Sequence, residues 1–172
     1  KQIWIVDKYF VFEFWEQNRI KMVVTESQVK AIQENWKTIR GRLQDYGNDL
    51  FMRYLVQNDG EQDHFSKFSS CPLSQLRTNA AFNAQTKLVM QALGSIVDHL
   101  DDIQRAAEFL RQRVRTHNRR HIYIAQFERL LDLMPMFLQE TASADGYVAD
   151  AWRILIADLM PAMRDEYARC NV

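Results

Sequence analysis

The amino-acid sequence predicts an all-α protein, and three observations lead to that prediction. Only five glycines and three prolines occur in 172 residues, which suits long helices better than a sheet with many turns. Apolar residues recur three and four positions apart along most of the chain, as on the buried face of a helix. Capping and turn residues separate these stretches. A chain of this length is expected to form one domain with a substantial core.

The helices are predicted from their starting residues and their apolar stripes. Thr25 and Gln28 form a capping box, in which each side chain satisfies a backbone amide at the start of a helix. Apolar residues then follow at helical spacing until near Gly41: Val29, Ile32, Trp36 and Ile39. Further helices are predicted over residues 42–57, 75–98, 106–117, 125–140 and 145–169. Pro135 and Pro161 fall inside the last two, and each should kink its helix or shift its boundary because proline lacks the amide donor.

Residues 1–24 differ from the rest of the chain. Aromatic residues crowd between positions 4 and 15 without a helical stripe, and charged residues interrupt any apolar run. The segment therefore matches neither a membrane-spanning helix nor a signal peptide. Partial alternation across residues 9–15 is compatible with a strand, a membrane-surface anchor or an extension folded over the core. We divide the chain into an N-terminal extension, 1–24, and a domain, 25–172.

Charge and cysteine content exclude several classes of protein. Lysine plus arginine equals aspartate plus glutamate, at 22 each, so no overall field attracts nucleic acid or an anionic membrane. Cys71 and Cys170 are too few and too far apart for a disulfide framework or a zinc site, and reduced cysteines in the cytoplasm are expected. The sequence also lacks a glycine-rich phosphate loop and the common hydrolase motifs.

The basic stretch "RVRTHNRRH", residues 113–121, allows several interpretations. His117 and His121 stand four apart, which is metal-ligand spacing on a continuing helix, but only Glu108 and Glu128 lie near enough in the sequence to add ligands. Its arginines do not line one stripe and no aromatic residues interleave them, so nucleic-acid binding is disfavoured. A solvated or core histidine would be the ordinary interpretation.

Over about residues 25–170 the sequence resembles the globin family. The motif "VTESQVKAIQENW" resembles the first globin helix, "GNDLFMRYL" the second and "HFSKF" the corner that follows. The motif "QTKLVMQALGSIVDHLDD" resembles the fifth helix, "LRQRVRTHNRRHIYIAQF" the segment that carries the proximal histidine, and "DAWRILIADLMPAM" the last helix. The resemblance implies the globin fold, a three-on-three helical sandwich around a pocket for haem b, which is iron protoporphyrin IX.

The resemblance also assigns roles to residues. His117 is the proximal iron ligand, with its other ring N–H oriented by Thr116 or by a carbonyl of the preceding turn. Gln85 takes the distal position, where its amide can donate to dioxygen but is a much weaker iron ligand than an imidazole, so the distal site should be open. The remaining pocket residues are expected to lie beside the gas ligand or the haem: Phe51, Val89, Phe65, Ile122, Phe127 and Leu130. Residues just past the ligand could pair with the haem propionates: Arg119, Arg120 and His121.

Three features depart from the family pattern. The proline that commonly begins the third helix is absent, with Asp59 near that place. Arg113, four residues before the proximal histidine, stands where the family usually has an apolar residue, which predicts an altered start or register of that helix. The stretch between the fifth helix and His117 is slightly longer than in many globins.

The function implied by the resemblance is reversible binding of dioxygen, for transport, storage or sensing, with carbon monoxide and nitric oxide as further ligands. Two alternatives use the same pocket. One is an enzyme, a nitric oxide dioxygenase or nitrite reductase that needs an external electron donor. The other is a sensor or interaction module that signals through the N-terminal extension. A homodimer is allowed, and neither a nucleic-acid partner nor a membrane-spanning segment is expected.

Overall fold

The computed structural model describes residues 23–171, and every regular element in that range is a helix. The elements are α2 (Glu26–Arg40), α3 (Leu43–Gln57), the 3₁₀ segments η1 (Glu61–His64) and η2 (Leu73–Thr78), α4 (Ala80–Asp98), α5 (Ile103–Asn118), α6 (Ile124–Thr141) and α7 (Gly146–Cys170). The all-α prediction is confirmed. The interpretations of residues 1–22 as a strand, an anchor or a folded-back extension lie outside the described residues.

The first helix begins as the capping box predicts. The Gln28 amide donates to Thr25 Oγ1 at 3.3 Å, and the Thr25 amide donates to Gln28 Oε1 at 2.9 Å. These contacts satisfy two of the amide donors that a helix start leaves free. Just before them, Val24 is buried and its amide donates to Asp158 Oδ2 of α7 at 2.6 Å. The start of α2 is thereby fixed against the last helix.

Two predicted helix starts are wrong. Residues 73–78 form the 3₁₀ segment η2, and α4 begins only at Ala80, because the side chain of Asn79 accepts from the amides of Ala81 and Phe82. Helix α5 begins at Ile103, three residues before the predicted start. Its cap is Asp102, which lies between the helices predicted over residues 75–98 and 106–117.

Both prolines lie inside long helices. Pro135 is within α6 and Pro161 within α7, and each helix continues for several residues beyond its proline. Neither proline therefore marks a boundary. Four residues upstream of each, a backbone carbonyl loses its helical donor.

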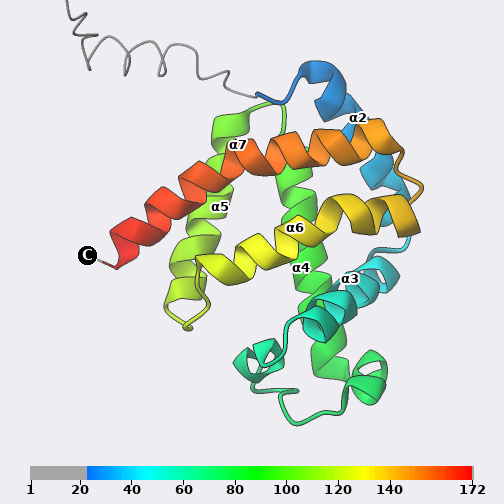
Figure 1. The fold of residues 1–172 in the computed structure, drawn as a ribbon, viewed down its shortest axis with the longest axis vertical. Coiled ribbons are helices and arrows are strands. Elements are labelled where there is room, and N and C mark those ends of the chain that lie inside the picture. The colour runs from blue at the N-terminus through cyan, green and yellow to red at the C-terminus, as the bar shows by residue number, and fades with distance from the viewer. Residues whose placement is uncertain (1–22, 172) are drawn as a thin grey trace, which may run out of the picture.

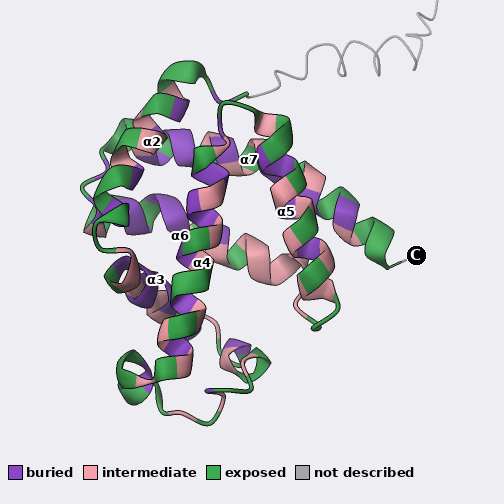
Figure 2. Cartoon of the chain, turned by 180° about the vertical axis from the view of Figure 1, so that it is seen from behind, coloured by how far each residue is buried: buried purple, intermediate pink, exposed green. Residues whose placement is uncertain are grey.

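The helices pack in two crossing layers. Helices α6 and α7 lie side by side and cross over α4 and α5, while α3 packs against both α4 and α6 (Figure 1). Figure 2 shows that buried residues follow the inward sides of the helices. At one end, Trp36 of α2 and Trp152 of α7 meet with ring centroids 5.9 Å apart. No helix within residues 23–171 is long and apolar enough to cross a membrane.

The core has two clusters, and they meet at α4 and α6. The larger cluster joins most of the helices, and the smaller one surrounds Phe51, Phe68 and Phe82. The partly buried Val89 and Leu130 pack against both clusters. Two cavities lie at this junction.

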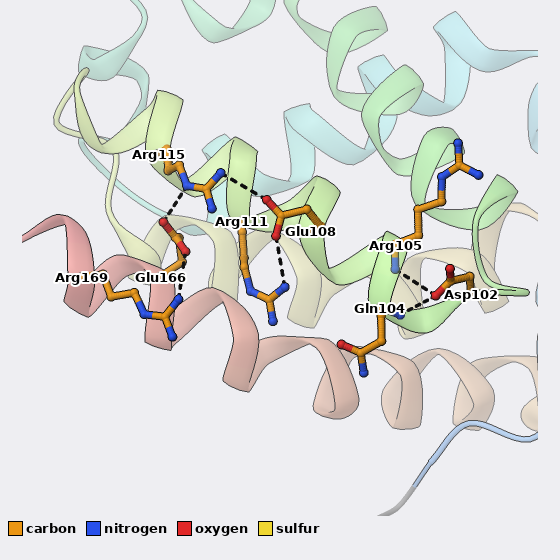
Figure 3. Close-up of polar contacts among 8 residues, drawn as sticks. All are labelled: Asp102, Gln104, Arg105, Glu108, Arg111, Arg115, Glu166 and Arg169. Carbon is orange, nitrogen blue, oxygen red and sulfur yellow. Dashed lines mark hydrogen bonds and ion pairs between the residues drawn. The ribbon is translucent and has the colours of Figure 1, made fainter.

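An ion-pair network holds α5 against α7 (Figure 3). Arg115 of α5 donates to Glu166 of α7 at 2.6 Å and to Glu108 at 3.2 Å, and Arg111 also pairs with Glu108 at 3.2 Å. Arg169 lies 3.8 Å from the second oxygen of Glu166. The Arg115 guanidinium, with smaller contributions from neighbouring arginines, lowers the pKa of the Glu166 carboxyl. The helix that carries His117 is thus held against α7 by charged contacts.

Candidate functional site

Two adjoining cavities lie between helices α4, α5 and α6. The larger has a volume of about 450 Å³ and extends along the slot between α4 and α5. The smaller, of about 70 Å³, reaches toward α3 and the corner after it. Residues from three helices line both cavities: Gln85, Val89, His117, Phe127 and Leu130. All five are among the site residues expected from the sequence.

His117 is in the last turn of α5 with a defined tautomer. Its Nδ1 lies 2.8 Å from the backbone oxygen of Arg113. A carbonyl oxygen can only accept, so Nδ1 carries the hydrogen and Nε2 of the neutral ring keeps its lone pair. Phe127 packs edge-on against the ring with centroids 5.0 Å apart. Burial, together with the charges of Arg120 and Arg113, lowers the pKa of His117 and favours the neutral imidazole.

Thr116 is the more distant of two acceptors near the ring hydrogen of His117. Its hydroxyl donates to the same Arg113 carbonyl at 2.9 Å and lies 3.4 Å from His117 Nδ1. The carbonyl of the preceding turn is therefore the nearer acceptor and the main group that orients the imidazole, and it also accepts from Thr116. This is the arrangement that gives a metal-binding histidine its second hydrogen bond.

Gln85 and Val89 form the opposite wall, one turn apart on α4. The Gln85 amide makes no hydrogen bond to other groups within residues 23–171 and faces the cavities. Behind it, Thr86 is fully buried and its hydroxyl donates to Asn48 of α3 at 2.6 Å. The contact fixes the register of α4 on α3 and hence the position of Gln85.

The far end of the smaller cavity is aromatic. Phe51 of α3 and Phe65 after η1 meet edge to face with centroids 5.2 Å apart, and Phe65 stacks on Phe68 at 5.1 Å. Ile122, in the loop between α5 and α6, completes this wall. The structure therefore brings together all of the apolar residues that the sequence analysis placed around the ligand.

A polar network beside the smaller cavity was missed by the sequence analysis. Tyr54 and Gln126 line the cavity. The Tyr54 hydroxyl donates to the buried carboxylate of Glu61 at 2.7 Å, Gln126 lies 3.4 Å from that carboxylate, and Arg129 forms an ion pair with it. Burial and the Glu61 charge raise the pKa of Tyr54, so its hydroxyl stays a donor. Tyr54 lies within the helix predicted over residues 42–57, and Glu61 lies outside every predicted helix, in the 3₁₀ segment η1.

Only one of the three residues expected to contact the haem propionates lines a cavity. Arg120 lines the larger cavity, whereas Arg119 and His121 line neither cavity. Helix α5 ends at Asn118, so His121 does not share a helix face with His117. It adopts a left-handed backbone with φ of 58°, and its Nδ1 lies 3.2 Å from the Tyr123 hydroxyl. Within the described part of the chain, no three His, Cys, Asp or Glu side chains are grouped to hold a metal ion.

A family model described as Globin matches residues 48–163, more than half of the chain and the whole region of the cavities. The chain belongs to the globin family. The resemblance drawn from the sequence motifs is confirmed, as is the globin fold.

Individual relatives of this globin are distant in sequence. Hemoglobin-2 of Phacoides pectinatus is 23% identical over 143 residues, which covers 83% of this chain and 94% of that one. A Drosophila melanogaster globin superposes with a TM-score of 0.75 at 18% identity, covering 82% of this chain and 94% of the other. A structure titled as a hexacoordinated heme protein from an anhydrobiotic tardigrade superposes with a TM-score of 0.76 at 20% identity, covering 84% and 95%. At these identities, the two structures show the shared fold alone.

Proposed function

We propose that this globin holds haem b in the two adjoining cavities and binds dioxygen reversibly, with His117 as the iron ligand and Gln85 beside the gas. The observation that carries the proposal is the state of His117. Its Nδ1 hydrogen is donated to the Arg113 carbonyl, so its Nε2 lone pair is free in a ring that lines both cavities. A neutral imidazole with one oriented nitrogen is the form that ligates haem iron.

The cavity residues fit a haem in size and chemistry. The larger cavity alone falls within the range of about 300–1,000 Å³ typical of ligand sites. The walls of both cavities are mainly apolar, and the aromatic side chains of Phe65 in the smaller cavity and Phe127 in both offer faces and edges for packing against a flat macrocycle. A haem bound there would supply a ferrous iron able to bind dioxygen, carbon monoxide or nitric oxide. An apolar surround slows oxidation of that iron by limiting the access of water.

Gln85 is suited to donate a hydrogen bond to a bound gas molecule without itself taking the gas molecule's place on the iron. Its amide is a donor with no hydrogen-bond partner among residues 23–171, and it can donate to the partly negative oxygen of dioxygen. An amide is a much weaker iron ligand than the imidazole of histidine. With haem bound, Gln85 would therefore leave room for a gas beside the iron, whereas the tardigrade structure is titled as that of a hexacoordinated heme protein.

The proposal is tested by removing the imidazole. His117→Ala, supplied with haem, should lose the iron–histidine absorption bands, and free imidazole added to the variant should restore them. His99→Ala is the matched control, because His99 lies outside both cavities and bonds to the Ser95 carbonyl. An unchanged spectrum in His117→Ala would show that another residue holds the iron.

A further inference from the structure

Arg113 projects into the larger cavity from the helix turn before His117. Its guanidinium carbon lies 4.5 Å from the centroid of the Phe109 ring, and both side chains line the cavity. The Arg113 Nε is buried and has no hydrogen-bond partner among the described residues. Arg113, which departs from the family pattern, is therefore a charged group that faces the larger cavity, on the same helix as His117.

The neighbouring arginines of α5 form ion pairs with carboxylates, which Arg113 does not do within the described residues. Successive residues of an α-helix are rotated by about 100°, so Arg113 points away from Arg111 and Arg115, which lie two positions to either side. Those two arginines pair with Glu108 and Glu166 in the ion-pair network between α5 and α7 (Figure 3). Arg113 forms no ion pair within residues 23–171 and faces the interior instead.

The larger cavity carries an uncompensated positive charge. Two arginines line it, Arg113 and Arg120, and no aspartate or glutamate of the described residues does so. Arginine does not lose its proton in proteins, and a partly buried charge is costly unless it is paired. Since the described part of the chain provides no anion at this place, a ligand is the natural source of one.

We infer that Arg113 and Arg120 form a carboxylate-binding subsite at the slot between α4 and α5, with Arg113 as the anchor that the rest of the family usually lacks. This inference rests on the proposed haem site, since the two propionates of haem b would match the two guanidinium groups in number and sign. The guanidinium fork suits a carboxylate because it donates two parallel hydrogen bonds. The cation–π contact with Phe109, at 4.5 Å from the guanidinium carbon to the ring centroid, restrains the fork at the cavity wall.

The same chemistry would also accept the carboxylate of a free fatty acid. Two sets of probes separate these sources in the haem-free protein. The first compares iron-free protoporphyrin IX with its dimethyl ester, which keeps the ring and removes both charges. The second compares dodecanoate with dodecanol. Neither pair contains iron, so binding by His117 does not contribute.

The experiment measures the dissociation constant of each probe, by porphyrin absorbance or by displacement of a fluorescent fatty acid. Wild type should bind the porphyrin acid about tenfold more tightly than the ester, the effect of one charge-assisted hydrogen bond. Arg113→Leu should abolish most of this preference, and Arg113→Lys should retain part of it. Arg105→Leu is the control, because Arg105 is exposed on the same helix and lines neither cavity.

Each outcome has a distinct meaning. A preference for the porphyrin acid that depends on Arg113 supports a propionate anchor. An Arg113-dependent preference for dodecanoate that survives in the haem-loaded protein identifies a separate fatty-acid subsite. Equal binding of acid and ester by wild type, or an unchanged preference in a folded Arg113→Leu, overturns the inference. If wild type binds neither porphyrin, the proposed function fails instead, and the dodecanoate pair alone decides whether Arg113 binds a carboxylate.

Discussion

At the scale of single residues, the free amide of Gln85 is the group expected to set how long dioxygen stays bound. Gln85→Leu keeps a similar volume and removes the donor. One hydrogen bond of about 1 kcal/mol corresponds to roughly a fivefold change in a rate or an equilibrium. Dioxygen release should therefore be about fivefold faster, and oxidation of the iron should also be faster. Stopped-flow release kinetics measure the first effect and loss of the oxygenated spectrum the second.

The control for this prediction is Gln112→Leu. Gln112 is exposed on α5 and lines neither cavity, so its replacement should leave both rates unchanged. Identical kinetics in wild type and Gln85→Leu would mean that the Gln85 amide does not reach the gas.

The Tyr54 hydroxyl is expected to stabilise the fold through the buried carboxylate of Glu61. Tyr54→Phe keeps the ring but removes a donor at 2.7 Å from an oxygen that has little access to water. The free energy of unfolding should fall by about 1–3 kcal/mol, as measured by urea denaturation of the haem-free protein. Tyr147→Phe is matched to it, because the Tyr147 hydroxyl bonds to Ser27 in an exposed position and should contribute less than about 0.5 kcal/mol. Equal effects of the two variants would contradict this role of Glu61.

Some of these residues could be predicted from sequence motifs, whereas the roles of others depend on contacts that only the fold creates. The resemblance to globin motifs was enough to propose Gln85 and His117 as site residues, and both line the two cavities. The roles of Tyr54 and Arg113 depend on partners distant in the chain or absent from it. A tyrosine in an apolar stripe looks like core, and an arginine near other arginines looks like surface, until the fold shows what each side chain faces.

At the scale of helices, close approach at Gly47 determines how α3 meets α4. A Cβ atom at Gly47 would lie 2.8 Å from Met90 Cγ and 3.0 Å from the backbone oxygen of Thr86. Gly47→Ala should therefore lower the free energy of unfolding by about 1–3 kcal/mol, although alanine is the better helix former. The measurement is again urea denaturation of the haem-free protein.

Gly146→Ala is the control for the helix contact. Gly146 is the first residue of α7, and no atom lies within 4 Å of a Cβ built there. This variant should be as stable as wild type or slightly more stable. A destabilised Gly146→Ala, or an unaffected Gly47→Ala, would mean that the α3–α4 contact is not tight.

The contact between α5 and α7 should weaken in acid. The pKa of Glu166 is lowered in the folded protein from its ordinary value of 4.5, first by its hydrogen bond to Arg115. A lowered folded-state pKa means that the carboxylate stabilises the fold above pH 4.5 and that this contribution is lost as the pH falls below it. Glu166→Gln should be less stable than wild type at neutral pH, with the difference shrinking below pH 4.5.

The acid prediction is checked by the free energy of unfolding of both proteins at neutral pH and below pH 4.5. Glu34→Gln serves as the comparison, because the Glu34–Lys37 pair is solvent-exposed and should contribute little at any pH. A constant difference between wild type and Glu166→Gln across this range would contradict the assigned role of the ion pair.

The elements themselves were predictable where local chemistry decides them. The capping box at Thr25 and the pattern of apolar, capping and turn residues predicted α2, α3, α6 and α7 to within about two residues, the usual uncertainty of a helix end. The starts of α4 and α5 were missed because Asn79 and Asp102 are each compatible with a turn as well as a cap. The 3₁₀ segment at residues 73–78 continues the helical spacing of α4, so periodicity alone does not separate them.

At the scale of the whole molecule, residues 23–171 are expected to contain everything needed for ligand binding. Val24 is buried and its amide bonds to Asp158, so a truncation that removes residues 1–22 leaves this contact in place. The truncated protein should bind dioxygen with the affinity of the full chain, as measured by equilibrium oxygen titration of both. A changed affinity would indicate that the N-terminal segment acts on the cavity, as the sensor interpretation requires.

The architecture follows from helices whose apolar faces can be buried only against one another. The two cavities lie where the core clusters meet, and His117 and Gln85 line both of them. Sequence patterns predicted the helices, and the resemblance to the globin family pointed to the two polar residues. The order in which the layers cross, and the cavity between them, required the structure.

The visible absorption spectrum of the reduced, oxygen-free, haem-loaded protein tests the central claim most directly. A haem held by His117 alone, with Gln85 opposite, should give the single broad visible band of a five-coordinate, high-spin iron. The sharp split bands of a six-coordinate, low-spin iron would show that a side chain closes the distal position, and would contradict the proposed gas site.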